Sequence, residues 1–148
     1  MTSLTQPLHD HHKHCDNLFA EAEEAAHKKR WPQCLESFRR FRGELEAHFS
    51  TEEQVLFPAF ETASGMMAGP SQVMRFEHAQ MRDLLGQIEQ AATQQNLDQF
   101  SGSAETLLVL MQQHNMKEEN ILYPMCDQHL AGETPELLAR LEAELAEG

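Results

Sequence analysis

Two segments of the chain have nearly the same sequence, and each begins with a histidine followed four positions later by a glutamate. The segments are HFSTEEQVLFPAF, from His48, and HNMKEENILYPMC, from His114. Sliding the first half of the chain by 66 positions, the difference between 114 and 48, aligns the two halves without a gap. The histidines and glutamates that recur at this offset include His12/His78, His48/His114 and Glu52/Glu118. Such a repeat predicts two copies of one supersecondary unit, related by a pseudo-twofold axis.

The sequence outside the two repeated segments is typical of helices connected by short loops. Strand-type alternation and Asn-Gly or Asp-Gly turns are absent from the sequence. We expect helices at about 4–29, 31–62, 70–95 and 96–127, and a tail helix at about 134–147. Pro32 and Pro70 suit first helical turns, and Asn96 and Thr134 suit N-caps. The fold class is therefore all-α: an antiparallel up-down-up-down four-helix bundle over about 4–128, with a short C-terminal helix.

Length and charge limit the classes of protein to which the chain can belong. Its 148 residues suit a single domain, 1–148, with a real hydrophobic core. The net charge of −13 argues against nucleic acid or an anionic membrane as partner. Three cysteines without a Cys-x-x-Cys motif fit a reducing compartment, and no segment resembles a signal peptide. We expect a cytoplasmic protein, and the oligomeric state is left open.

The repeated histidines and glutamates predict a metal site. Residues four apart on a helix share a face, so each His-x-x-x-Glu pair can point into a bundle core. The other two helices add one imidazole each. The predicted metal ligands are four histidines and two glutamates: His12, His48, Glu52, His78, His114 and Glu118.

This set of ligands suits two metal ions better than one. If both carboxylates bridge, each ion receives four protein bonds, and positions remain for a bridging water, hydroxide or oxide and for an exogenous ligand such as dioxygen. Imidazole and carboxylate without thiolate favour redox-active iron, with zinc or manganese as alternatives. A duplicated hairpin that kept polar residues only for packing is the metal-free alternative. It is disfavoured because six buried polar groups at one level need partners.

Neighbouring residues are less certain members of the site. The sequence leaves open whether His9, Glu44, Glu53 or Glu119 also contacts a metal. His11 is expected to point away from the site into solvent. Tyr123 lies nine positions after His114, about half a turn from the ligand face, so we expect a helix-packing residue. Apolar neighbours are expected to wall the site in both halves: Val55, Leu56, Ala59, Ile121, Leu122 and Met125.

The same residues resemble the hemerythrin-like (HHE cation-binding) domains. HFSTEEQVLFP, MRFEHAQMRDLL and QQHNMKEENILYPM look like characteristic helices of that family, and the resemblance covers about residues 8–128. It implies an antiparallel four-helix bundle with a non-haem di-iron centre bridged by two carboxylates. By position, the resemblance implies His12 and His48 on one iron, His78 and His114 on the other, and Glu52 and Glu118 as bridges.

Two positions depart from the oxygen-carrying hemerythrins. Those proteins have a further histidine where Met74 stands, and a bridging aspartate five residues after the last histidine in place of Glu118. A more open and symmetric site argues against simple reversible dioxygen carriage. We therefore expect binding of dioxygen or a related small oxidant in sensing, scavenging or redox and iron homeostasis.

Two other functions are compatible with the same set of ligands. One is a di-iron peroxidase, catalase-like or nitric-oxide-linked enzyme. The other is metal storage or a structural metal module that acts through a partner. Whether the protein is an enzyme is left open by the sequence.

Overall fold

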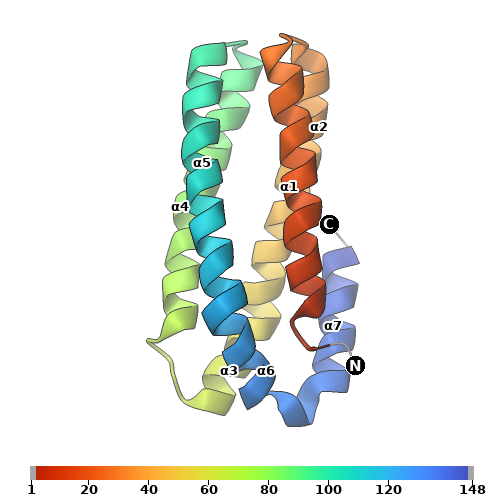
Figure 1. Cartoon of the computed structure of the whole chain (residues 1–148), viewed down its shortest axis with the longest axis vertical. Coiled ribbons are helices and arrows are strands. Elements are labelled where there is room, and N and C mark those ends of the chain that lie inside the picture. The colour runs from red at the N-terminus through yellow and green to blue at the C-terminus, as the bar shows by residue number, and fades with distance from the viewer. Residues whose placement is uncertain (1–2, 147–148) are drawn as a thin grey trace.

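The computed structural model describes residues 3–146, and this range is helical with no strand. Four long helices run antiparallel, and the α1–α2 and α4–α5 turns meet at one end of the bundle (Figure 1). The predicted all-α up-down-up-down bundle is confirmed. None of the helices within 3–146 has the length and apolar character needed to cross a membrane. The long helices are α1 (Gln6–His27), α2 (Trp31–Thr51), α4 (Pro70–Thr93) and α5 (Leu97–Lys117).

The second and fourth helices of the bundle continue beyond α2 and α5 through a π-helical turn. The first continuation is η1 (Glu52–Leu56) and α3 (Phe57–Ser64), and the second is η2 (Glu118–Leu122) and α6 (Tyr123–His129). Both π turns begin at a repeat-matched glutamate, although the sequence predicted uninterrupted helices here. The 3₁₀ turn η3 (Ala131–Glu133) then leads to α7 (Thr134–Ala146), and the predicted end of this helix at 147 lies outside the described residues.

The two hairpin turns repeat the same backbone conformation. Lys29 and Gln95, which match at the repeat offset, both have left-handed backbones with φ of 58° and 56°. The next N–H in each turn, of Arg30 or Asn96, donates at 2.9 Å to a carbonyl in the last turn of the preceding helix. This is the usual bonding of a left-handed helix end. The Asn96 side chain also caps α5, as predicted.

Two apolar clusters lie along the bundle, one on each side of a polar layer. The cluster towards the hairpin turns contains aromatic rings in tilted or edge-on contact, including Phe19, Phe38, Phe41 and Phe100. The cluster at the opposite end joins leucines and phenylalanines of the bundle to α7. Each large apolar side chain buried in these clusters stabilises the fold by about 1.5–3 kcal/mol. The clusters therefore offset the cost of burying polar groups between them.

The tail helix makes the two halves differ on their outer faces. Val55 is 3% exposed because α7 packs against η1 and α2, and Leu137 and Leu141 of α7 share its cluster. Its repeat partner Ile121 is 54% exposed. The expectation that Ile121 walls the site is therefore wrong, whereas Leu122 is buried as predicted.

Candidate metal centre

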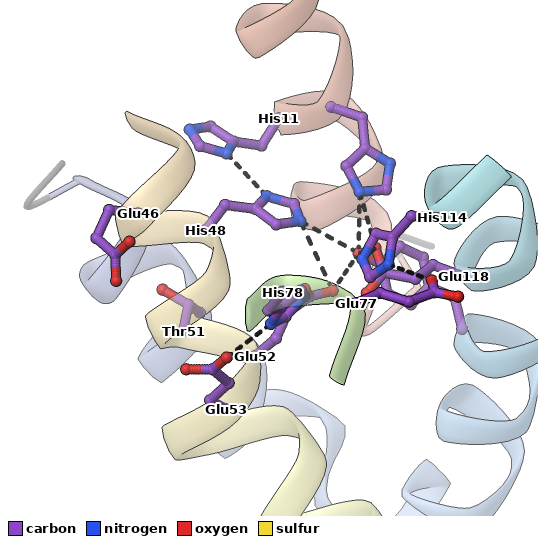
Figure 2. A network of polar contacts seen from close by, with 12 residues as sticks. His11, Glu46, His48, Thr51, Glu52, Glu53, Glu77, His78, His114 and Glu118 are labelled. Atoms are coloured by element: carbon purple, nitrogen blue, oxygen red, sulfur yellow. Dashed lines mark hydrogen bonds and ion pairs between the residues drawn. The ribbon is translucent and has the colours of Figure 1, made fainter. Parts of the chain in front are cut away.

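The side chains of the six predicted ligands meet in the polar layer between the two clusters. Figure 2 shows the five that it labels pointing towards a common centre: His48, Glu52, His78, His114 and Glu118. None of the six is more than 5% exposed. Their ligating atoms form two groups, in each of which all atoms lie within 4.8 Å of one another. The groups are Glu52, His78, His114 and Glu118, and His12, His48 and Glu118.

The distances within the layer are those of groups that converge on a common centre. His78 Nε2 lies 3.1 Å from Glu52 Oε1, and His114 Nε2 lies 3.4 Å from Glu118 Oε1. His12 Nε2 lies 3.1 Å from the same oxygen of Glu118. Within the first half, His48 Nε2 and Glu52 Oε2 lie 3.6 Å apart across one helical turn. The structure thus brings together all six residues that the repeat predicted.

Four buried polar atoms of this layer have no well-directed hydrogen bond, because the 3.1 Å contact between His78 Nε2 and Glu52 Oε1 lacks hydrogen-bond geometry. Among residues 3–146 they are Glu52 Oε1, His78 Nε2, His114 Nε2 and Glu118 Oε2. One atom comes from each member of the first group. Leaving a buried polar atom unpaired costs about 1–3 kcal/mol, so four together are unexpected in a layer that serves only for packing. Imidazole nitrogens and carboxylate oxygens are the donors of many metal sites, and the residues present therefore fit a bound cation.

Tyr123 belongs to the polar layer, which the sequence did not predict. Its hydroxyl donates to Glu52 Oε2 at 2.6 Å, and it also lies 3.1 Å from Glu118 Oε1. The Tyr123 hydroxyl oxygen is also 3.3 Å from His12 Nε2 and 3.4 Å from His48 Nε2. Burial and the two carboxylates hold the pKa of Tyr123 well above its ordinary value, so the phenol keeps its proton.

The π turn explains why the prediction for Tyr123 was wrong. A π turn contains about one residue more than an α turn, so residues beyond it are rotated back by roughly 100°. That rotation carries Tyr123 from the far side of the helix towards the ligand face. Its repeat partner Phe57 occupies the equivalent place: Tyr123 stacks on His12 at 5.7 Å, and Phe57 stacks on His78 at 5.8 Å. The near match of Phe57 and Tyr123 in the repeat was the available signal.

Three of the four histidines are held from behind by a glutamate. In each, Nδ1 lies within hydrogen-bond reach of the carboxylate, which leaves Nε2 directed at the centre of the layer. A carboxylate in this position fixes the tautomer and the ring orientation, and it makes the imidazole a stronger metal ligand. Glu53 and Glu119 have this supporting place and belong to neither group of converging atoms. The pairs are His12–Glu119 at 2.6 Å, His78–Glu53 at 2.8 Å and His114–Glu77 at 2.8 Å.

The fourth histidine, His48, is held by another histidine. His48 Nδ1 lies 2.9 Å from His11 Nδ1, and the two rings stack with centroids 5.1 Å apart. The His11 side chain is only 10% exposed, so the expectation that it points into solvent is wrong. Glu44 binds the other nitrogen of His11 at 3.1 Å, while His9 is half-exposed and lies 3.4 Å from the supporting Glu119.

The charges in the polar layer perturb its members in opposite directions. Burial opposes protonation of His114, but the charges of Glu118 and Glu52 and its hydrogen bonds raise its pKa to about 9. Burial dominates at His48 and lowers its pKa to about 3. Burial and the nearby charge of Glu52 raise the pKa of Glu118. Burial therefore disfavours the charged form of both His48 and Glu118, and a cation between the two carboxylates would offset the repulsion between Glu52 and Glu118.

Comparison with known proteins agrees with this geometry. A family model described as the hemerythrin HHE cation binding domain matches residues 3–126. The chain belongs to this family. Neither the comparison with curated proteins nor that with solved structures gave a match. As a hemerythrin HHE domain, the chain has a cation-binding fold, and its buried cluster of histidines and glutamates could hold a metal.

One departure of this HHE domain from the oxygen carriers is clear in its packing. Met74, which stands where those proteins have a further histidine, is 2% exposed and lies in the apolar cluster with Phe57 and Leu122. That position is therefore filled by a hydrophobic side chain. Each half of the polar layer has two histidines, which supports the symmetric set of ligands expected from the repeat.

Proposed function

We propose that this HHE domain is a non-haem di-iron protein that binds dioxygen or a related small oxidant, in sensing, scavenging or redox protection. His12 and His48 would hold one iron, His78 and His114 the other, and Glu52 and Glu118 would bridge. The observation that carries the proposal is the pair of converging groups that share Glu118, together with four unpaired donor atoms.

The donor set favours iron over the alternatives. Four imidazoles and two carboxylates combine intermediate and hard donors, which suits iron in both of its common oxidation states. All three cysteines are free and buried, and none belongs to either converging group. Without thiolates, a structural zinc site of the usual kind is disfavoured. When bound, a ferrous pair supplies two electrons to a small oxidant.

The protein's own residues would shield the centre and supply a hydrogen-bond donor. The ring of Phe49 stacks on His78 with centroids 4.0 Å apart, and Phe57 covers the same imidazole from another direction. These rings exclude water from the His78 side. On the other side, the Tyr123 hydroxyl is a buried hydrogen-bond donor within 3.1 Å of an oxygen of each carboxylate. It can therefore donate a hydrogen bond to a ligand bound near His12.

The two long faces of the bundle differ in access to the centre. Between α1 and α5 a groove of about 740 Å³ is lined by His12, Glu119 and Asp16. On the opposite face, the repeat partner of Asp16 is Arg82, whose guanidinium binds both Glu46 and Glu53. The arginine covers the position that corresponds to the groove. A small ligand would thus approach from the His12 side.

Exposure of iron-loaded protein to air tests this function. Metal-free protein loaded anaerobically with two equivalents of ferrous iron should react with dioxygen or peroxide within the mixing time of a manual experiment. The oxidised product should show the near-ultraviolet absorption and the antiferromagnetic coupling of a bridged ferric pair. Zinc-loaded protein is the matched control and should show neither. Absence of any reaction with dioxygen and peroxide would overturn the redox function.

A further inference from the structure

The support behind His48 breaks the symmetry of the centre. Three candidate ligands place Nδ1 against a carboxylate, whereas His48 places it against the imidazole of His11. The repeat makes this difference specific: the partner of His11 at the offset of 66 is Glu77, which supports His114. One half of the chain thus has a histidine in the position where the other half has a carboxylate.

The two halves also differ at a second position near this contact. The Nε2 atom of His11 lies 3.1 Å from Glu44 Oε2, and Glu44 stands on α2 one turn before His48. The repeat partner of Glu44 is Leu110, so the other half has no carboxylate in that place. His48 therefore has no glutamate directly behind it. Its glutamate is Glu44, which lies behind His11 instead.

The hydrogen bonds assign the tautomers along this chain of residues. Because His48 Nε2 faces the centre, its Nδ1 carries the proton and donates to His11 Nδ1. A neutral His11 then carries its own proton on Nε2 and donates to Glu44. Both short contacts are satisfied without a charged ring. The planes of the two rings differ by only 6°, which lets the N–H of His48 point along the lone pair of His11.

We propose that His11 and Glu44 are positioning residues that orient His48 through a carboxylate–imidazole relay and make the two metal ions chemically inequivalent. The proposal rests on the proposed function, because it presumes that His48 binds an ion. Neither residue contacts the ion itself. Removing a hydrogen-bond partner behind a ligating histidine commonly weakens metal binding about 10–100-fold. Here the loss of affinity should affect only the ion that His48 would bind.

The test compares variants by anaerobic ferrous titration and by Mössbauer spectroscopy of ⁵⁷Fe-loaded protein. His11→Phe keeps an aromatic ring against His48 but removes the acceptor, and should weaken one ion about 10–100-fold while the other binds normally. Glu44→Leu, which copies Leu110, should do the same while leaving His11 in place. The double variant His11→Glu/Glu44→Leu copies Glu77 and Leu110 and should keep both affinities, with an altered quadrupole doublet for one iron alone.

His14→Phe is the matched control, since His14 is on the same helix, is 45% exposed and lies beside His11 and Glu44 without lying between them and His48. It should bind both ions as the wild type does. If the wild type itself fails to bind two ions, the proposed function fails. If the wild type binds two and both His11→Phe and Glu44→Leu bind them with unchanged affinity and spectra, the relay alone is overturned. Should His11→Phe not fold, Glu44→Leu decides the question by the same titration.

Discussion

Replacing Glu118 with alanine should remove both metal ions from the protein. Glu118 is the one residue among 3–146 that belongs to both converging groups, and its carboxylate lies 3.1 Å from His12 and 3.4 Å from His114. Its loss should weaken the binding of both ions by more than roughly 100-fold. That figure is the upper end of the loss seen when only a hydrogen-bond partner of a metal ligand is removed. Metal content after purification and ferrous titration measure the loss.

A second buried carboxylate provides the control for Glu118→Ala. Glu61 is 7% exposed and binds Ser71 and Arg75, outside the polar layer. Glu61→Ala should lower the stability of the fold and keep both ions. The metal-free Glu118→Ala protein should still fold, because the substitution removes a buried carboxyl group with one unpaired oxygen. Two ions retained in folded Glu118→Ala would contradict the assignment of this residue as a bridge.

Removing the metal from the wild-type protein should lower its melting temperature by on the order of 10 °C. A ligand present at 1,000 times its dissociation constant stabilises the folded state by about 4 kcal/mol. For a chain of this size, each kcal/mol shifts the melting temperature by roughly 2–4 °C. The unpaired atoms Glu52 Oε1, His78 Nε2 and Glu118 Oε2 are the local cause, since a cation would satisfy them.

Differential scanning calorimetry with and without a chelator measures this shift. Glu118→Ala is the control, and its melting temperature should not respond to the chelator. The same transition in chelated and metal-loaded wild type would mean that the polar layer is stable without a cation. That result would favour the metal-free alternative of a duplicated hairpin that kept its polar residues for packing.

The internal repeat was sufficient to predict the bundle and the six converging residues. Periodicity gives the helices, and the offset of 66 selected His12 from the four histidines near the N-terminus. The structure places His12 in the layer at 5% exposure, whereas His9 and His14 are about half-exposed. The repeat succeeds because residues that match across two copies of one hairpin occupy equivalent places about the pseudo-twofold axis.

The π turns set the limit of what helical periodicity could predict. Rotation by 100° per residue places Tyr123 away from the ligand face and Ile121 on it. The extra residue in η2 reverses both: the Tyr123 hydroxyl lies 2.6 Å from Glu52, and Ile121 is 54% exposed. A π turn depends on local packing and on the direction of Glu118, and no residue type encodes it.

Contacts between helices set a second limit. His11 is adjacent to His12, and its rotation along α1 alone suggested a solvated side chain. It is covered because α2 brings Glu44 and His48 against it. Val55 is likewise buried only because α7 packs beside η1. Such pairings depend on which helices neighbour one another, and periodicity within a single helix does not contain that information.

Anomalous X-ray scattering at the iron edge, from crystals of protein purified without added metal, tests the central claim most directly. Two iron peaks should appear in the polar layer, one beside His12 and His48 and one beside His78 and His114, with Glu118 contacting both. No peak in the layer, one peak alone, or peaks that appear only at the zinc edge would contradict a di-iron centre held by these six side chains.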